Sequence, residues 1–378
     1  MKIALIYDWI ATWGGAERVL LSLHEMFPKA DWYTAYYDKK NAPWAEDFTI
    51  HTSFIQKIPI NPYRIRWLTA PLFPFAFESF NFTNYDLVIS CTSYFAKSVI
   101  TRPETKHICY LLTPTRYLWK DPYIHNNFLM KSLLNPYIKY LKKWDYAASQ
   151  RPDQYIAISE TVKKRIKKYY HRDSEVIYPP FDITYWEKVK SEIQNANFQT
   201  NSKFEIESSK YYLMVSRLES YKNVDLVVSL FKQLNKKLII IGTGSQENRL
   251  KSIASANITF FNRLSDQQLG QLYTHAQALI MPQEEDFGYT ALEAQFFGCP
   301  VISYRKSGAS ESIIEDRTGI FFDQQKSDSL QKALAKYEDL AYTLHRSTLK
   351  DGLKNIERFS KERFKTEFMH SIASSTKL

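Results

Sequence analysis

Residues 278–293 read Ala-Leu-Ile-Met-Pro-Gln-Glu-Glu-Asp-Phe-Gly-Tyr-Thr-Ala-Leu-Glu, an apolar run followed by a turn and a second apolar pattern. The apolar run predicts a buried strand, and the spacing after the turn predicts a helix. Glu285 therefore follows the strand, and Glu293 lies about two turns into the helix. Amides near a helix start favour an anion, and here they belong to Phe287, Gly288 and Tyr289.

This stretch thus places two carboxylates, which can bind hydroxyl groups, on either side of amides that can bind phosphate. A nucleotide sugar requires that combination. On spacing alone, two solvated glutamates around an ordinary strand–helix turn explain the pattern equally well.

Strand and helix patterns alternate on both sides of this stretch. In the first half, apolar runs predict strands over 2–7, 87–90, 107–112, 154–159 and 176–178. In the second half, they predict strands over 211–216, 237–241, 258–261, 278–281, 300–303 and 319–322. Such alternation predicts an α/β fold with a doubly wound parallel sheet in each half.

The chain divides into two expected domains. Residues 188–210 are polar with little periodicity, and we interpret them as the connection. We therefore expect a Rossmann-like N-terminal domain over 1–187 and a C-terminal domain over 211–358.

The composition is that of an ordinary soluble protein, with 378 residues, 44% hydrophobic and 24% charged. The three cysteines, Cys91, Cys109 and Cys299, have no paired spacing. This argues against a disulfide framework or a cysteine zinc site and favours a reducing compartment. No run approaches the roughly 18 apolar residues of a membrane-spanning helix. We therefore expect a cytoplasmic protein, peripheral at the inner face of the cell membrane.

Positive charge is concentrated in one segment. Residues 97–172 contain 16 Lys or Arg against 5 Asp or Glu, an excess larger than the net charge of +10 of the whole chain. Within 131–172, lysines alternate with aromatic and aliphatic residues, as suits an anionic membrane surface, where each basic residue contributes about 1 kcal/mol. A solvated helix face explains the pattern equally well. No nucleic-acid-binding module is visible, so we expect no nucleic acid partner.

The spacing of the two glutamates, with Phe-Gly between them and Gly-Cys-Pro-Val-Ile at 298–302, resembles the signature of family 4 of the retaining glycosyltransferases. The resemblance spans nearly the whole chain. It implies the GT-B fold, in which two Rossmann-like domains face across a cleft. It also implies that the C-terminal helix, within 359–378, packs back on the first domain.

The resemblance assigns roles in the second domain. Glu285 resembles the carboxylate that holds the donor sugar, and Glu293 the one that holds the ribose. Arg217 and Lys222 match an Arg and a Lys that stabilise the departing diphosphate, and we expect Lys222 to be exposed in the cleft.

Two glycine-containing loops and one arginine match further donor-binding positions of the family. Gly14 and Gly15 follow the first strand, where a tight strand–helix turn is the alternative. Gly244 ends a Gly-x-Gly after another strand. Arg263 falls in the segment that contacts the base.

Three features resemble bacterial mannosyltransferases of surface-polysaccharide assembly: Asp286 in place of the usual glycine, and the stretches 112–119 and 176–182. They imply transfer of mannose from GDP-mannose to a lipid-linked saccharide, although a UDP-linked donor stays open. The acceptor-side candidates are Leu112, Arg116 and Tyr117. Leu112 stands where such enzymes have a histidine, and leucine cannot donate a hydrogen bond.

The chain has no Asp-x-Asp and no cluster with metal-ligand spacing, so we expect a metal-independent hexosyltransferase without a cofactor. Two alternatives remain. The change to Leu112 would suit a weakened, nucleotide-binding scaffold protein. The fold would also suit another enzyme, such as a sugar-nucleotide epimerase or a phosphorylase.

Overall fold

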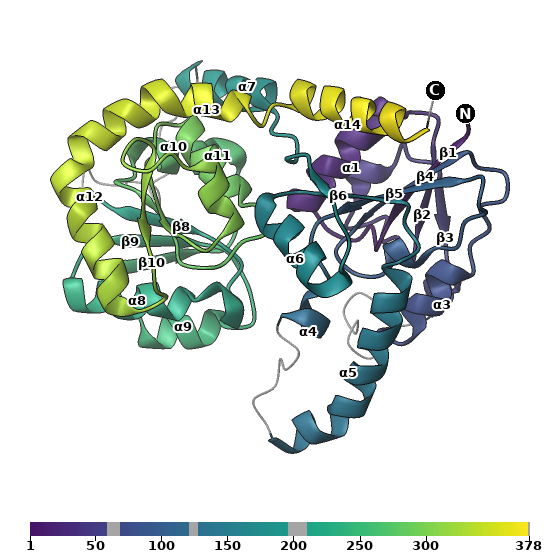
Figure 1. The fold of residues 1–378 in the computed structure, drawn as a ribbon. Coiled ribbons are helices and arrows are strands. Elements are labelled where there is room, and N and C mark those ends of the chain that lie inside the picture. The colour runs from purple at the N-terminus through teal and green to yellow at the C-terminus, as the bar shows by residue number, and fades with distance from the viewer. Residues whose placement is uncertain (59–68, 121–127, 196–209, 377–378) are drawn as a thin grey trace. The chain divides into compact units, whose positions relative to one another are not determined.

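The computed structural model describes residues 1–58, 69–120, 128–195 and 210–376, with the backbone alone for 128–134 and 376 (Figure 1). The chain forms two compact units. The first contains Met1–Pro180 and Glu362–Leu378, and the second contains Phe181–Lys361.

The first unit is built on a seven-stranded parallel sheet in the order β3-β2-β1-β4-β5-β6-β7. Its strands are β1 (Ile3–Tyr7), β2 (Asp31–Thr34), β3 (Ile50–Thr52), β4 (Leu87–Thr92), β5 (Lys106–Leu111), β6 (Gln154–Ala157) and β7 (Glu175–Val176). Its α-helices are α1 (Gly15–Met26), α3 (Leu72–Glu78), α4 (Arg116–Trp119), α5 (Phe128–Ala148), α6 (Glu160–Tyr170) and α14 (Lys361–Thr376). Short 3-10 turns are η1 (Pro43–Ala45), η2 (Phe54–Lys57) and η3 (Ala96–Ser98).

The second unit has a six-stranded parallel sheet in the order β10-β9-β8-β11-β12-β13. Its strands are β8 (Tyr212–Val215), β9 (Leu238–Ile241), β10 (Ile258–Phe261), β11 (Leu279–Met281), β12 (Val301–Tyr304) and β13 (Gly319–Phe322). Its helices are α7 (Ile183–Asn195), α8 (Val224–Leu234), α9 (Glu247–Ile253), α10 (Asp266–His275), α11 (Tyr289–Phe296), α12 (Ser327–Ser347) and α13 (Leu353–Glu357). Two 3-10 turns are η4 (Ser220–Lys222) and η5 (Gly308–Ser312), and η6 (Thr348–Gly352) is a π-helical turn between α12 and α13.

Both sheets confirm the prediction of a doubly wound parallel sheet in each half. In each sheet the strand order reverses next to the first strand, between β1 and β4 and between β8 and β11. The central strands are buried along their whole length because helices cover both faces of such a sheet. All six residues of β4 and all four of β9 are buried. This topology brings the loops after β8 and β11 together at one edge.

The residues that we expected to form a polar connection begin within a helix. α7 ends at Asn195, so 188–195 are helical, and 196–209 lie outside the described residues. Trp186 and Val189 are buried, and the Trp186 ring lies 5.7 Å from that of Phe297. A short apolar stripe among polar residues was therefore sufficient to hold this helix against the second unit.

α14 is part of the first unit. The rings of Phe364 and Phe368 each lie 5.8 Å from the ring of Tyr110 on β5. Lys365 adds an ion pair of 2.8 Å to Glu25 on α1, and α14 runs beside α1 in Figure 1. The end of the chain thus covers the sheet formed by its beginning.

A fully buried ion pair fixes the loop between β5 and α4. Lys97 Nζ lies 2.6 Å from Asp145 Oδ1, and both side chains have no exposed surface. Asp145 also accepts hydrogen bonds from Thr115 Oγ1 (3.0 Å), Trp119 Nε1 (2.7 Å) and Tyr170 Oη (2.9 Å). Burial of the carboxylate is tolerated because each oxygen has charged or polar donors.

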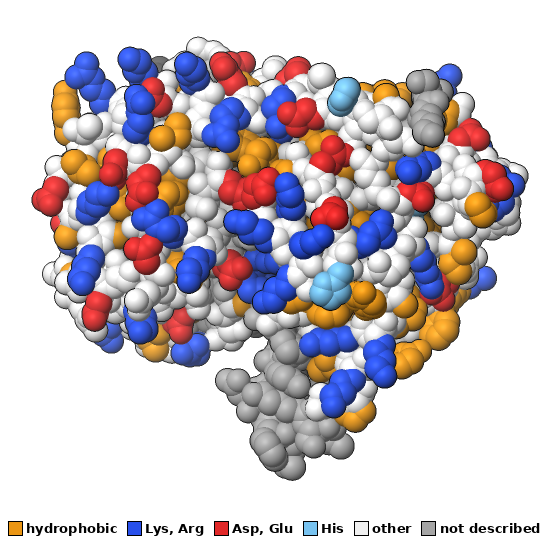
Figure 2. All heavy atoms as spheres, viewed as in Figure 1, with side chains coloured by type: hydrophobic (Ala, Val, Ile, Leu, Met, Phe, Trp, Pro, Cys, Tyr) orange, Lys and Arg blue, Asp and Glu red, His pale blue; other side chains and the backbone are white. Residues whose placement is uncertain are grey.

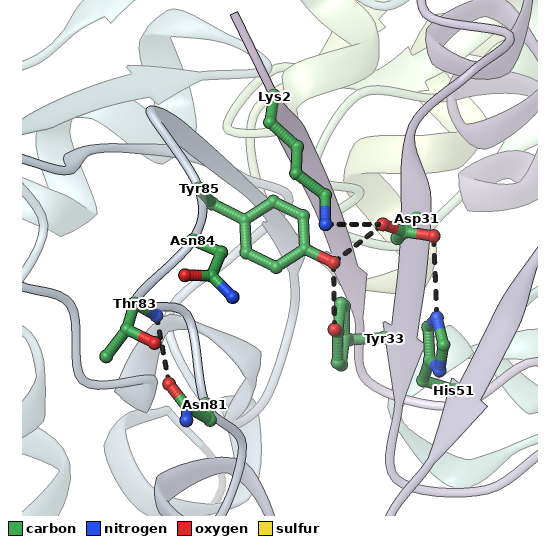
Figure 3. Close-up of a pocket in the computed structure, with 8 residues that line it drawn as sticks. All are labelled: Lys2, Asp31, Tyr33, His51, Asn81, Thr83, Asn84 and Tyr85. Carbon is green, nitrogen blue, oxygen red and sulfur yellow. Dashed lines mark hydrogen bonds and ion pairs between the residues drawn. The ribbon is translucent and has the colours of Figure 1, made fainter.

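A polar cavity of about 390 Å³ lies at the amino ends of β1 and β2 (Figure 3). Asp31 is its central group, with Tyr85 Oη at 2.6 Å, His51 Nε2 at 3.4 Å and Lys2 Nζ at 3.9 Å. The hydrogen bond from Tyr85 opposes the effect of burial, and the pKa of Asp31 is below its ordinary value. The cavity is on the edge of the sheet opposite to the loops that follow the strands.

The buried His107 on β5 generates a pH-dependence of stability. Its Nε2 lies 2.9 Å from Ser90 Oγ, and burial lowers its pKa to about 4. As the pH falls from 7 to 4, His107 therefore becomes protonated in the unfolded chain but stays largely neutral in the folded chain. Above the unfolded-state pKa, His107 does not reduce the free energy of unfolding. By pH 4 it reduces the free energy of unfolding by about 3 kcal/mol.

We expect His107→Gln to remove this part of the pH-dependence, while His275→Gln, at an exposed position on α10, should leave it unchanged. Guanidinium unfolding of the wild type and the two variants at pH 4, 5, 6 and 7 measures the free energy of unfolding of each. Equal slopes for all three would contradict the assignment.

Candidate active site

The candidate site of the second unit lies where the strand order reverses. β8 and β11 are parallel neighbours there, with Leu213 paired to Leu279. The loop after β8 carries Arg217 and leads to η4, which ends at Lys222. The loop after β11 carries Glu285. Loops at this position of an open parallel sheet are where ligands bind.

Lys222 and Glu285 form an ion pair. Lys222 Nζ lies 2.6 Å from Glu285 Oε1, and their side chains are 7% and 20% exposed. Burial raises the pKa of Glu285, but the Lys222 ammonium and the hydrogen bonds to the carboxylate outweigh it and bring the pKa below its ordinary value. The expectation that Lys222 is exposed is therefore wrong, because its charge is neutralised within the protein.

The main chain of Glu285 is held from the loop after β12. Its N–H donates to Ser307 Oγ at 2.9 Å, and its carbonyl accepts from the Gly308 N–H at 2.8 Å. A Cβ on Gly308 would lie 2.2 Å from the carbonyl oxygen of Asp286, so only glycine permits this approach. Ser307 and Gly308 were missed in the sequence because 22 residues separate Ser307 from Glu285.

The predicted helix start is present. α11 begins at Tyr289 after Gly288, whose φ of 97° favours glycine, and no side chain caps its first turn. Phe287 is buried, with its ring 5.6 Å from that of Phe359. The first amides of α11 thus lie beside Glu285, where they favour an anion.

Glu293 lies inside α11 and is only 4% exposed. Its Oε2 accepts a hydrogen bond of 3.2 Å from Tyr273 Oη on α10. The second glutamate of the motif is therefore already engaged with the protein itself.

Three further candidates lie at the same edge of the sheet. Arg217 is exposed, with its guanidinium 6.0 Å from the ring of Tyr221. Gly244 packs on the next loop, since a Cβ there would lie 2.4 Å from the carbonyl oxygen of Leu218. Arg263 is exposed just after β10. The carboxyl ends of four adjacent strands therefore bring these residues to one edge.

The corresponding place in the first unit is occupied by a carboxylate of the protein. Asp8 follows β1, is 1% exposed and accepts from Thr92 Oγ1 at 2.7 Å. Four backbone amides also donate to it at 2.8–3.1 Å, those of Ser93, Tyr94, Phe95 and Ala96. Burial raises the pKa of Asp8, and these hydrogen bonds oppose that shift. This anion-binding turn is therefore already filled, which the sequence alone did not reveal.

The other candidates of the first unit lie near this turn. Gly14 and Gly15 form the start of α1. Leu112 is 8% exposed and follows β5, where its N–H donates to the carbonyl of Thr92 at 2.9 Å. The structure therefore places Leu112 at the buried carboxyl end of β5.

Arg116 and Tyr117 begin α4. Among the residues that the structure describes, none forms a hydrogen bond with the buried hydroxyl of Tyr117. Burial raises the pKa of this phenol. Both residues follow Thr115, which the buried Lys97–Asp145 pair fixes.

Two general features concern the described part of the chain. It contains no group of three His, Cys, Asp or Glu side chains arranged to hold a metal ion. Nor does any of its helices combine the length and apolar character needed to cross a membrane.

The sequence and the fold are similar to those of known glycosyltransferases and related enzymes. Human alpha-1,3/1,6-mannosyltransferase ALG2 is 27% identical over 181 residues, which is 42% of each chain. The match thus spans less than half of the length of that relative. Sucrose-phosphate synthase from Thermosynechococcus elongatus has the same fold, with a TM-score of 0.72 and 15% identity over 99% of both chains. Anabaena HepE, solved in complex with UDP, gives a TM-score of 0.68 and 15% identity over 99% of this chain and 100% of its own.

Two family models cover most of the sequence. The model of glycosyltransferase family 4 matches residues 13–185, and that of glycosyl transferases group 1 matches residues 196–350. The two sheets have Rossmann-like strand orders, and the fold as a whole is similar to that of the two solved structures. The chain therefore belongs to the family 4 glycosyltransferases.

Proposed function

We propose that this protein transfers a hexose, with retention of configuration, from a nucleotide sugar to an acceptor hydroxyl. The observation that carries the proposal is the Lys222–Glu285 pair beside Arg217 at the carboxyl edge of the second sheet. The two cations suit the phosphates of a diphosphate, and the carboxylate suits hydroxyl groups. The start of α11 adds amides to the same edge.

In this proposal Glu285 binds hydroxyl groups of the donor sugar. Lys222 and Gln283 both donate to its Oε1, at 2.6 and 2.8 Å. Its Oε2 accepts no hydrogen bond from the residues that the structure describes, so it can accept one from the sugar. The lowered pKa keeps the carboxylate ionised for that contact.

The chemical step needs no nucleophile from the protein. The bond from the anomeric carbon to the phosphate oxygen breaks, the acceptor oxygen bonds to the same face of that carbon, and the departing phosphate takes the acceptor proton. Arg217, Lys222 and the α11 amides stabilise the charge that develops on the phosphate. These groups would do without a metal ion what a divalent cation does in other transferases.

The donor is proposed on two grounds. The human relative is named a mannosyltransferase, and the motifs at 112–119 and 176–182 resemble mannosyltransferases, so GDP-mannose is our first choice. The Anabaena neighbour was solved with UDP, so a UDP-linked sugar is the alternative. In either case Gly244 and Arg263 lie where the nucleotide would bind, and Glu293 would reach the ribose only after local rearrangement around Tyr273.

The acceptor is proposed to be a lipid-linked saccharide at an anionic membrane surface. α5 exposes Lys139, Tyr140 and Lys143, and α6 exposes Lys164, Lys167 and Lys168. Figure 2 shows Lys and Arg side chains over both helices. The Lys142 ammonium lies 5.6 Å from the Trp119 ring, which stacks on Tyr169 at 5.4 Å. Mixed lysines and aromatic rings suit the interface of such a membrane.

The scaffold alternative rests on Leu112. The burial of Leu112 is compatible with the scaffold and with the transferase, since positioning and charge stabilisation do not depend on a group at that place. An epimerase would need no acceptor, and a phosphorylase would need phosphate.

Calorimetric titration with GDP, GDP-mannose, UDP and UDP-glucose, each with and without magnesium, tests the donor site. We expect one nucleotide class to bind, equally well without the metal. Turnover of the bound sugar nucleotide with a lipid-linked saccharide then separates the transferase from the scaffold, which would bind the nucleotide and transfer nothing. Absence of binding by all four would refute the donor site.

Arg217→Gln should lower turnover about a hundredfold, because it removes a cation from the leaving diphosphate. Its melting temperature should not change, since the side chain is exposed. Arg249→Gln is the matched control, an arginine 60% exposed on α9, and should keep full activity. Equal activity of the two variants would exclude the role of Arg217.

Replacing Lys163, Lys164, Lys167 and Lys168 with glutamine should weaken binding to vesicles containing anionic lipid by at least tenfold, since about 1 kcal/mol is lost per charge. The control removes the same charge from the second unit, at the exposed Lys232, Lys251, Lys332 and Lys350. Co-sedimentation measures both. Equal loss in the two variants would show that net charge alone is responsible.

A further inference from the structure

Gln283 is a buried polar residue next to the candidate active site that the sequence did not single out. It lies in the loop after β11, two residues before Glu285, and is 1% exposed. Its Nε2 donates a hydrogen bond of 2.8 Å to Glu285 Oε1. The contact is made by an amide to a carboxylate that is itself held ionised.

The other end of the same amide is unsatisfied. Gln283 Oε1 is buried and has no hydrogen-bond partner among the residues that the structure describes. The reverse orientation of the amide would place its oxygen against the Glu285 carboxylate, so the assigned orientation is the only favourable one. A buried acceptor without a partner is costly and calls for an explanation. A methionine or leucine would fill the same space without that cost.

The contact limits the freedom of Glu285. Ser307 and Gly308 hold its main chain, at 2.9 and 2.8 Å, so that only its side-chain torsions remain. Gln283 and Lys222 bind the same oxygen from two directions and fix those torsions. The free Oε2 is then held in one place, as a group that binds a ligand requires.

Lys222 alone would not suffice for this. Its ammonium has three N–H donors and is attracted to a donor diphosphate as well as to Glu285. Gln283 is uncharged, so a phosphate does not draw it away from the carboxylate. It keeps the orientation of Glu285 when Lys222 also contacts the leaving group.

We propose that Gln283 is a positioning residue that orients Glu285 toward the donor sugar. The inference rests on the proposed function of Glu285. In this role the Gln283 N–H group orients the carboxylate that binds the sugar. The cost is the buried Gln283 Oε1, which has no hydrogen-bond partner among the described residues.

The test is Gln283→Met, which keeps the side-chain volume and removes the amide. We expect its kcat to fall about tenfold and the KM for the sugar nucleotide to rise, because a misoriented Glu285 binds the donor sugar less well. The acidic limb of the pH–rate profile should move to higher pH, because Glu285 loses a donor that favours its charged form. The melting temperature should stay equal or rise, because the unpaired acceptor is gone.

The matched control is Gln325→Met. Gln325 Nε2 donates a hydrogen bond of 2.8 Å to the carbonyl of Pro282, which lies in the same loop as Gln283. This hydrogen bond does not involve Glu285. Its kcat and pH profile should match the wild type. A Gln283→Met protein that is less stable, with an unmoved acidic limb, would make Gln283 a packing residue and overturn the inference.

One binding measurement and one NMR titration keep this test separate from that of the proposed function. Gln283→Met should weaken binding of GDP-mannose or UDP-glucose, whichever the wild type binds, but not of the corresponding diphosphate. The same substitution should raise the pKa of the Glu285 carboxyl. Carbon NMR on glutamate-labelled protein measures this pKa, and the Glu285→Gln variant assigns the signal. No sugar transfer by the wild type would refute the proposed function, whereas an unchanged pKa and unchanged relative affinity would refute the role of Gln283.

Discussion

The reversal of strand order between β8 and β11 is the constraint on which the rest of the candidate site depends. Because the two strands are parallel neighbours, their carboxyl ends meet, and the loops that follow them leave in different directions. Lys222 and Glu285, 63 residues apart, reach 2.6 Å only through this pairing. The pairing of β11 with β12 on its other side adds Ser307 and Gly308, which hold the main chain of Glu285.

The two units have the same kind of sheet topology but differ in the anion-binding turn at its carboxyl edge. In the first sheet, Asp8 occupies the amides that follow β4, and five donors satisfy its carboxylate. In the second sheet, the first turn of α11 has no side-chain cap, and Arg217 is exposed. A closed anion site supports the fold, whereas an open one can bind a ligand. This difference supports a nucleotide site in the second unit.

Two buried pairs of lysine and carboxylate show the same distinction. Lys97 and Asp145 have no exposed surface, and both Asp145 oxygens accept hydrogen bonds. Lys222 and Glu285 leave one carboxylate oxygen without a donor from the described residues, and Gln283 beside them keeps an unpaired acceptor. A complete network rigidifies a core, while an incomplete one retains capacity for a ligand. We therefore regard the first pair as structural and the second as functional.

The sequence by itself determined the two parallel sheets, the helix that starts at Tyr289 and the family, because strand periodicity and the glutamate motif are local patterns. It did not reveal α7 within the expected connection, where a few apolar residues among polar ones carry the helix. Only the tertiary structure decided that Lys222 is buried, that Asp8 fills the first anion site, and that Gln283 and Ser307 hold Glu285. Burial and hydrogen bonding of these residues depend on partners brought together by strand pairing, and no spacing along the chain records which loops will meet.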